Sequence, residues 1–187
     1  LPCRLILRDW INENLNRILK SYDLNQIQWT AEGNNDRIVN RIDSLIDRVD
    51  IIPIKLVMAQ AIIESGWGTS RFAKEGNNYF GIHCFTKGCG MKPVGIAHSD
   101  FEVKVFSSVT DAIKSYLHIL NTGYAYKNLR KIRANFREQG KKPDPLQLAL
   151  GLGQYSQIGD KYASIIKNVI YDYLPKDISA LMVEKSD

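Results

Sequence analysis

The chain has 187 residues, with 25 lysine and arginine residues against 20 aspartate and glutamate residues, which gives a net charge of +5. A chain of this length can bury about 70% of its unfolded surface, so it can form a full core without disulfides or metals. Apolar residues make up 44% and charged residues 24%, and no stretch approaches the roughly 20 apolar residues of a membrane-spanning helix. These values exclude an integral membrane protein and predict one globular domain with an N-terminal helical extension.

The positive charge favours polyanionic partners in general, namely nucleic acid, anionic lipid or an anionic cell-wall polymer. The densest basic group lies at helical spacing among apolar residues and consists of Lys127, Arg130, Lys131, Arg133 and Arg137. A solvated helix face explains this spacing more simply than a stripe that binds nucleic acid. We therefore predict no nucleic-acid partner.

The first part of the chain carries three helical patterns. Apolar residues recur at helical spacing in two segments, at Leu7, Ile11, Leu15, Ile18 and Tyr22, and at Ile38, Ile42, Leu45, Ile46 and Val49. A third segment, residues 56–63, is apolar on almost every side, as is typical of a buried helix. Pro53 fits its first position, and Gly66 and Gly68 end it.

The pattern changes from residue 77 onward. Three short β-prone runs, residues 79–83, 94–96 and 101–106, are separated by Gly, Pro and Ser-Asp and predict a small antiparallel sheet. Alternation along the last run places Phe101, Val103 and Val105 on one face. Glu102, Lys104 and Phe106 fall on the other face.

Helices are predicted again after the sheet. Ser108 to Asp111 resembles a capping box, Asp144-Pro145 begins a short helix and Asp160 caps the last one. The expected ranges are residues 109–120, 129–136, 145–150 and 162–173, followed by a frayed tail from 176 to 187. The predicted fold class is α+β and mainly helical, with a small β-hairpin lobe beside a groove suited to an extended polymer.

Glu64 is the residue that indicates chemistry. It is the only carboxylate between Leu56 and Gly68 and lies in the last turn of the predicted buried helix. Burial and the negative end of the helix dipole both disfavour its anion and raise its pKa. Each pKa unit corresponds to about 1.4 kcal/mol of difference between the two protonation states. A carboxyl group that stays protonated at neutral pH can act as a general acid. The alternative is a side chain that points outward or forms an ion pair with Arg71.

Glycoside hydrolysis needs such an acid and usually a second carboxylate. Glu102 and Asp100, on or beside the hairpin, are the candidates, and the orientation of Glu102 is consistent with either a groove or bulk solvent. A separation of roughly 6.5 to 9.5 Å between the two carboxyl groups indicates an inverting enzyme, and about 5 Å indicates a retaining one.

Aromatic side chains provide flat surfaces for sugar rings. The candidates are Trp67, Tyr79, Phe80, Tyr124, Tyr155 and Tyr162, among which Phe80 fits the core better. Other chemistries have less support, because the glycines match no phosphate-binding loop. The histidines form no recognisable nucleophile arrangement, although a Cys84 nucleophile with a distant histidine stays open.

Cys84 and Cys89 enclose a four-residue loop, and three interpretations of this pair stay open. They can form a disulfide, remain free thiols, or bind zinc with His83 and His98. Structural zinc sites usually show a second clear pair of ligands, so we assign no metal.

A longer signature surrounds Glu64. Residues 59–73, AQAIIESGWGTSRFA, and residues 76–82, GNNYFGI, resemble the signature of bacterial glucosaminidase-type peptidoglycan hydrolases. The continuation through residues 83–90, 101–116, 120–125 and 154–163 is most similar to the Bax-type branch of envelope proteins in that family. The similarity extends over about residues 36–173.

The resemblance implies a lysozyme-like fold and hydrolysis of β-1,4 bonds beside N-acetylglucosamine in peptidoglycan strands, without cofactor or metal. It implies domains at 1–35 (a helical extension packed on the domain), 36–175 (glucosaminidase) and 176–187 (tail), in a monomer of the cell envelope. The resemblance places the catalytic acid on Glu64 and a tyrosine motif that lines the sugar site on Tyr155 and Tyr162, with the second acidic residue on the hairpin at Glu102 or Asp100. We predict Glu64, Glu102 and Tyr155 as catalytic residues. The predicted substrate-binding residues are Trp67, Asn78, Tyr79, Tyr124 and Tyr162. A muramidase, a lytic transglycosylase and a non-catalytic glycan-binding module are the alternatives.

Overall fold

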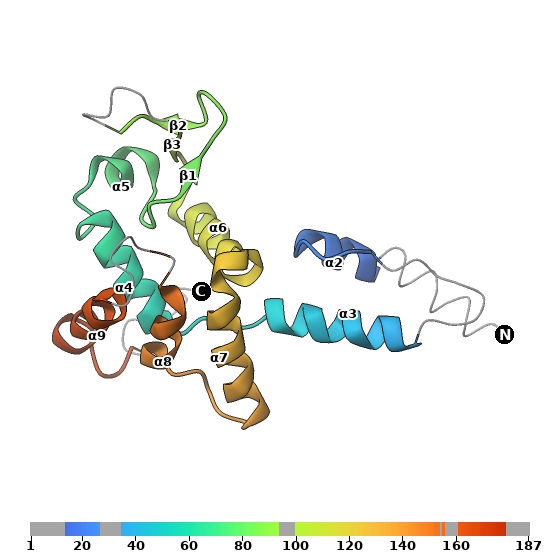
Figure 1. Ribbon diagram of the computed structural model, residues 1–187. Coiled ribbons are helices and arrows are strands. Elements are labelled where there is room, and N and C mark those ends of the chain that lie inside the picture. Colours follow the sequence, from blue (N-terminus) through green and yellow to red (C-terminus); the bar gives the residue numbers. More distant parts are fainter. Residues whose placement is uncertain (1–13, 27–34, 94–99, 154, 156–160, 179–187) are drawn as a thin grey trace, which may run out of the picture.

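The computed structural model describes residues 14–26, 35–93, 100–153, 155 and 161–178. Several predictions fall outside these residues: the first part of the N-terminal helix, the run 94–96, the Asp160 cap, and the tail from residue 179 onward. The described chain is mainly helical with one small sheet, which confirms the predicted α+β class (Figure 1).

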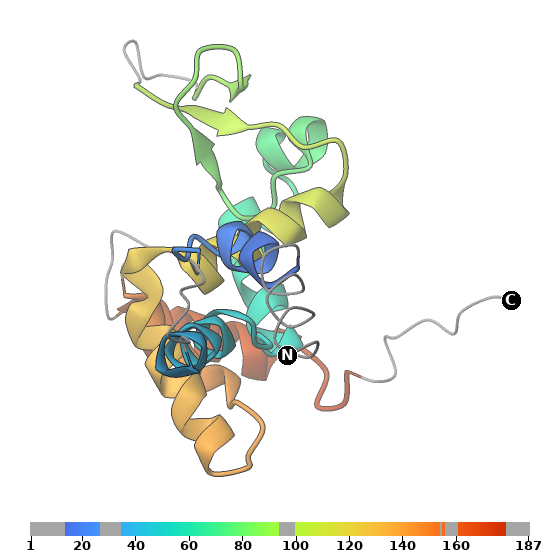
Figure 2. The ribbon, with the colours of Figure 1, turned by 90° about the vertical axis from the view of Figure 1, so that its right-hand side faces the viewer.

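Two N-terminal helices form an arm beside the body of the molecule (Figures 1 and 2). The arm consists of α2 (Asn16–Ser21) and α3 (Asn35–Arg48). Leu15 and Leu19 are buried in a small cluster of their own with Leu24, Ile38 and Leu45. The last turn of α3 contacts α6 and α7 of the body, so the arm joins the rest of the protein at one end.

Helix α4 (Ile54–Ser65) is the central helix of the body and packs against α8 (Pro145–Ala149) and α9 (Lys161–Tyr173). Leu56 and Ala59 are fully buried, because neighbouring helices enclose α4 on most sides. Pro53 is its N-cap rather than its first residue, and Gly66 ends it in the left-handed conformation at φ +56°, which glycine adopts without strain. The predicted helix is thus confirmed with a shift of one residue at its start.

The other helices complete the main core. They are α6 (Val109–Thr122), the 3-10 turn η2 (Tyr124–Tyr126), α7 (Lys127–Glu138) and the 3-10 turn η3 (Leu150–Leu152). The predicted caps are present: the Ser108 hydroxyl accepts from the Asp111 amide at 3.1 Å, and Asp144 caps α8. Phe80 is buried in the core, as expected, and stacks on Tyr116 with 4.2 Å between ring centroids.

The sheet lies at the end of the body opposite α7 and α8 (Figures 1 and 2), and α5 (Arg71–Gly76) connects α4 to it. Its strands β1 (His83–Cys84), β2 (Gly90–Met91) and β3 (Glu102–Lys104) are antiparallel in the order β1-β3-β2. The first predicted run contributes only His83 to a strand, and β2 was not predicted. A two-residue strand that starts with glycine has no alternation to reveal it.

The predicted alternation along β3 does not separate a buried face from an exposed one, because both faces of the strand are covered. Glu102 and Val103 are adjacent, yet both are buried, with 9% and 5% of their surface exposed, whereas Val105 is 43% exposed. β3 is the central strand, and the loop between β1 and β2 covers the Glu102 side. Val105 lies beyond the strand, which ends at Lys104, so the two-residue period no longer applies to it.

The solvated face predicted for α7 is also corrected. Arg130 and Arg133 are 9% and 0% exposed. Arg130 donates to the carbonyl groups of Leu120 and Gly123 at the end of α6, and Arg133 donates to those at residues 47 and 50, at the end of α3. Carbonyl groups at a helix C-terminus lack partners in their own helix, so they bind cations well. The arginines therefore join α7 to its neighbours, while Lys127 and Lys131 remain exposed.

Within the described residues, no helix combines the length and the apolar content needed to cross a bilayer.

Candidate active site

Glu64 lies in the last turn of α4, at the side of the helical body that leads to α5 and the sheet (Figure 1). Its side chain is partly buried, and this burial raises the pKa of the carboxyl group above its ordinary value, against the lowering effect of a hydrogen bond from Tyr162. The alternative pairing with Arg71 does not occur. The Arg71 guanidinium donates instead to the Lys92 carbonyl group at 2.7 Å.

A chain of buried hydrogen bonds ends on Glu64. Tyr116 donates its hydroxyl proton to Gln60 Oε1, Gln60 Nε2 donates to the Tyr162 hydroxyl at 3.1 Å, and Tyr162 donates to Glu64 Oε1 at 2.6 Å. Tyr116, Gln60 and Tyr162 are each 0–1% exposed. Every donor points toward the carboxyl group, so the chain fixes one oxygen of Glu64 and is ready to stabilise negative charge there.

Gln60 and Tyr116 were missed by the sequence analysis. Gln60 lies four residues before Glu64, one turn earlier on the same face of an otherwise apolar stretch. That spacing is a signal that could have identified it. Tyr116 fits the apolar pattern of α6 and carries no such signal.

The second oxygen of Glu64 faces Gly81. A Cβ at residue 81 would lie 3.6 Å from Glu64 Oε2, and Gly81 adopts φ +64°, a conformation that suits glycine. Among the described residues, no hydrogen bond is made to Oε2. The carboxyl group is therefore held through Oε1, and its Oε2 accepts no hydrogen bond from the described residues.

Tyr155 braces the loop that carries Gly81. Its hydroxyl donates to the Phe80 carbonyl group at 2.8 Å, and its ring stacks on Tyr162 with 5.9 Å between centroids. The ring of Tyr126 lies 5.9 Å from that of Tyr155. Burial, followed by the charge of Glu64, raises the pKa of Tyr126. Tyr126 is thus a second aromatic neighbour of the site, and the sequence analysis did not name it.

Asn78 was expected to bind substrate, and the structure places its side chain inside the protein. Its side chain is 1% exposed; Nδ2 donates to the Ile82 and Lys104 carbonyl groups, and Oδ1 accepts from the Phe80 and Ile82 amides. All of its polar atoms are engaged inside the protein. In this structure Asn78 therefore holds the backbone of the loop around Gly81.

The other expected sugar-binding residues fall into three positions. Trp67 is 57% exposed, directly follows the end of α4, and packs edge-on against Tyr173 at 4.7 Å. Tyr79 is partly exposed, and its ring lies beside Gly68 in the same turn. Tyr162 is 1% exposed, so it contacts Glu64 rather than offering a surface to a sugar ring. Tyr124 is 88% exposed and lines a separate cavity between α3 and α7.

Glu102, the expected second carboxylate, is engaged by the loop between β1 and β2. Its two oxygens accept from the Gly88 amide at 3.1 Å and from the Gly90 amide at 2.8 Å. These hydrogen bonds lower the pKa of Glu102. The loop is closed by a disulfide between Cys84 and Cys89, which settles the question left open by the sequence. The three residues are close enough to be considered as metal ligands, but both sulfur atoms are in the disulfide.

Two cavities lie away from Glu64 among the described residues. One, of about 240 Å³, is on the hairpin and is lined by Asp100, Phe101 and Glu102 together with Phe85. The other, of about 400 Å³, is the one beside Tyr124. The groove next to Glu64 stays a prediction.

Comparison with known proteins places the chain in a family. The model of the family described as mannosyl-glycoprotein endo-beta-N-acetylglucosaminidase matches residues 40–174. The chain belongs to this glucosaminidase family. The match confirms the resemblance and the lysozyme-like α+β class, and it includes Gln60, Glu64, Tyr155 and Tyr162, while α2 lies outside it.

A curated relative supports the assignment to the glucosaminidase family. The chain is 35% identical over 148 residues to protein Bax of Escherichia coli (strain K12), which is 79% of this chain and 50% of the relative. The chain thus spans about half the length of that protein. No solved structure gives a significant match.

Proposed function

We propose that the chain hydrolyses β-1,4 glycosidic bonds next to N-acetylglucosamine in bacterial peptidoglycan, as an endo-β-N-acetylglucosaminidase. The observation that carries the proposal is the Glu64 carboxyl group, whose pKa is raised by burial and whose Oε2 has no hydrogen-bond partner among the described residues. Membership of the glucosaminidase family limits the substrate to a glycan. The similarity to a bacterial protein favours a bacterial glycan.

Glu64 acts as the general acid. Because Oε1 accepts the Tyr162 hydroxyl hydrogen, the proton of the neutral carboxyl group resides on Oε2. Its transfer to the bridging oxygen lets the bond from that oxygen to the anomeric carbon break, and Glu64 becomes an anion. The hydrogen bond from Tyr162 strengthens as this charge develops, so it stabilises the transition state more than the ground state.

The role that a second carboxylate usually plays in glycoside hydrolysis is assigned here to the substrate itself. The pKa of Glu64 is set by burial and by Tyr162, whereas two carboxylates that share a site shift one another strongly. Glu102 is engaged by the loop amides. We assign it to holding the hairpin, and we assign to the 2-acetamido oxygen of N-acetylglucosamine the attack on the anomeric carbon, in the substrate-assisted manner. Water then opens the resulting ring and returns a proton to Glu64.

Trp67 and Tyr79 supply the sugar-binding surface. Trp67 is exposed in the turn that directly follows Glu64, and Tyr79 is partly exposed beyond α5, with its ring beside Gly68 of that turn. A sugar ring has an apolar face of C–H groups that packs on an aromatic ring. These two residues therefore orient the substrate, while Tyr155 and Tyr162 keep the catalytic group in place.

Peptidoglycan lies outside the cytoplasmic membrane, so this activity requires an exported protein of the cell envelope. The Cys84–Cys89 disulfide agrees with that location, since disulfides persist mainly in oxidising compartments.

Digestion of purified peptidoglycan tests the proposal. Mass spectrometry of the released fragments is expected to show new N-acetylglucosamine reducing ends, and Glu64→Gln is expected to release none. N-acetylmuramic acid reducing ends would identify a muramidase instead, and anhydromuramyl ends a lytic transglycosylase. Binding to the polymer with no fragments from the parent protein would identify a non-catalytic module.

A further inference from the structure

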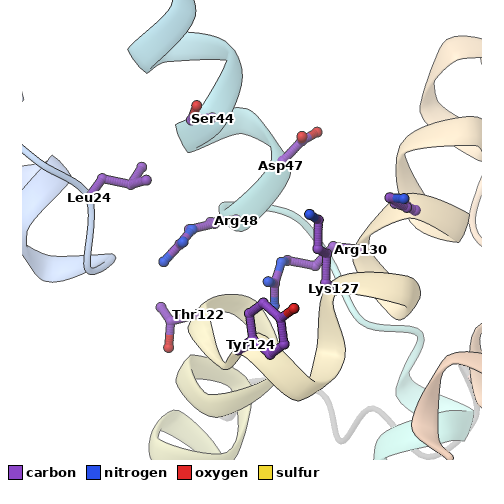
Figure 3. A pocket seen from close by; sticks show the side chains of 9 residues that line it. Leu24, Ser44, Asp47, Arg48, Thr122, Tyr124, Lys127 and Arg130 are labelled. Carbon is purple, nitrogen blue, oxygen red and sulfur yellow. The ribbon is translucent and has the colours of Figure 1, made fainter.

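A cavity of about 400 Å³ lies where the arm meets the body, away from Glu64 (Figure 3). Helix α3 forms one wall, and η2 with the first turns of α7 forms the other. The lining residues are Leu24, Ser44, Asp47, Arg48, Thr122, Tyr124, Lys127, Arg130 and Lys131. The cavity therefore brings together segments about 80 residues apart in the chain.

The cavity has an excess of positive charge. Four of its lining side chains are cationic and one, Asp47, is acidic. The Asp47 carboxylate is bound at 2.8 Å by Arg137, which is not a lining residue. Among the described residues, none of the four cations forms a salt bridge of its own, so the positive charge of the cavity exceeds what Asp47 can offset.

Two of these cations are held in place close to one another. Arg130 is 9% exposed and its Nη1 donates to two carbonyl groups, while Arg48 Nη1 donates to the Tyr22 carbonyl group at 2.6 Å. Burial and then the positive charge of Arg48 lower the pKa of Arg130, and only Asp47 opposes them. Two guanidinium groups held near one another repel, and an anion bound between them would offset this repulsion.

The cavity lining around Tyr124 suits an anionic group that is part of a larger organic molecule. In Figure 3, Arg48 extends from α3 toward Thr122, while Lys127 and Arg130 lie beside the ring of Tyr124. Tyr124 is 88% exposed and offers a flat apolar surface. Helix α7 begins here at Lys127 with no side chain capping its first amides, so its positive end adds to the field.

We propose that this cavity is a second substrate-binding site, which takes an anionic oxygen group of the cell-wall polymer. The group is a carboxylate of a peptide stem or a phosphate of an attached polymer, and the two share the chemistry that Arg48, Lys127 and Lys131 recognise. The nature of the polymer rests on the proposed function. The turn η2 links the two sites, because Tyr124 lines the cavity while Tyr126, two residues on, lies against Tyr155.

Calorimetric titration of the whole chain tests this site, with Glu64→Gln present throughout to prevent turnover. The probes are muramyl dipeptide, the same compound with its carboxylate converted to an amide, and poly(glycerol phosphate). The double variant Lys127→Gln/Lys131→Gln removes two exposed cations of the cavity. Lys141→Gln/Lys142→Gln, on the exposed loop after α7, is the matched control with the same change in net charge.

The cavity variant is expected to raise the Kd of at least one anionic probe about tenfold or more, with the control unchanged. Added salt should weaken binding to the parent far more than to the variant. A response to muramyl dipeptide but not to its amide identifies the stem carboxylate, and a response to the phosphate polymer alone identifies the attached polymer. Tyr124→Ala removes only an exposed ring and is expected to weaken the same probe.

Equal loss in the cavity variant and the control would overturn the proposal, because net charge alone would then explain binding. So would a loss in the cavity variant that is as large for the amide as for both anionic probes, or binding of single-stranded DNA as tight as that of the cell-wall probes. The proposed function can fail separately. If the parent releases no N-acetylglucosamine ends but the cavity variant alone loses anion binding, the site stands and the activity does not.

Discussion

Two carboxyl groups, one at the end of α4 and one on the hairpin, have opposite acidities. Among the described residues, Glu64 receives one hydrogen bond, from Tyr162, and burial prevails to raise its pKa. Glu102 receives two from backbone amides, and these prevail over burial to lower its pKa. A carboxyl group desolvated by burial thus becomes a proton donor, whereas one engaged mainly by backbone amides stays an anion.

The same difference separates their roles. A carboxyl group with an oxygen free of donors can release a proton to a substrate, as Glu64 Oε2 can. A carboxylate with both oxygens engaged keeps a loop closed, as Glu102 does for the loop between β1 and β2. Four substitutions test this comparison.

Glu64→Gln is expected to have the largest effect. Loss of the general acid should lower kcat by about 10³-fold or more, because the amide has the same size and cannot protonate the leaving oxygen. The Tm should change little, and binding of a chitooligosaccharide should persist. Release of reducing ends from peptidoglycan is the measurement. A variant that digests at even a tenth of the parent rate would remove Glu64 from the reaction.

Tyr162→Phe is expected to have the second-largest effect. It removes the hydrogen bond from Tyr162 to Glu64, which should cost about tenfold to a hundredfold in kcat. The hydrogen bond lowers the pKa of Glu64, so its loss should raise that pKa further. Activity needs the protonated form and falls as pH rises through the pKa, so the descending limb of the pH profile should move to higher pH.

Tyr171→Phe is the matched control for this substitution, since Tyr171 is 66% exposed on the same helix. It is expected to leave both the rate and the pH profile unchanged. A descending limb that stays in place in Tyr162→Phe would show that Tyr162 does not act through the proton of Glu64.

How far the sequence predicts this site depends on the distance between partners along the chain. The helix around Glu64 was predicted because the residues that indicate it, an apolar run ended by Gly66, are adjacent in the sequence. The hydrogen bonds that complete the site join residues 56 to 102 positions apart, from Tyr116 and Tyr162 to α4. Such contacts arise only from the packing of α6 and α9 on α4, and no local sequence pattern predicts them.

A motif also does not separate residues that touch substrate from residues that support them. Asn78 lies within the family signature, but its four hydrogen bonds to the backbone place it in the scaffold. Arg133 illustrates the same limit on α7. Its spacing was that of a solvated face, and its burial follows from carbonyl groups of α3 more than 80 residues away.

Gly81→Ala is expected to have a smaller effect than either change at Glu64 or Tyr162. The left-handed φ of +64° costs a residue with a Cβ about 1–2 kcal/mol of folding free energy, and the new methyl group would contact Glu64 Oε2. Crowding and desolvation of that oxygen should reduce kcat by several fold and raise the pKa seen in the pH profile.

Gly140→Ala isolates the backbone part of that effect. Gly140 has the same φ of +64° with open space around it, so it should lower the Tm by a similar amount and leave the kinetics unchanged. An identical kinetic change in both alanine variants would mean that strain, rather than contact with Oε2, limits the rate at Gly81.

Glu102→Gln is expected to change catalysis least, with a smaller change in kcat than Gly81→Ala, and to act mainly on the stability of the hairpin. The folded pKa of Glu102 is lowered, so its contribution to stability is present above the ordinary glutamate pKa of about 4.3 and is lost as pH falls through the folded value. The Tm difference between parent and variant should therefore be full at pH 7 and shrink toward pH 3. If Glu102→Gln instead abolishes turnover while its Tm matches the parent, Glu102 is the second catalytic carboxylate, and two backbone hydrogen bonds do not keep a carboxylate out of the chemistry.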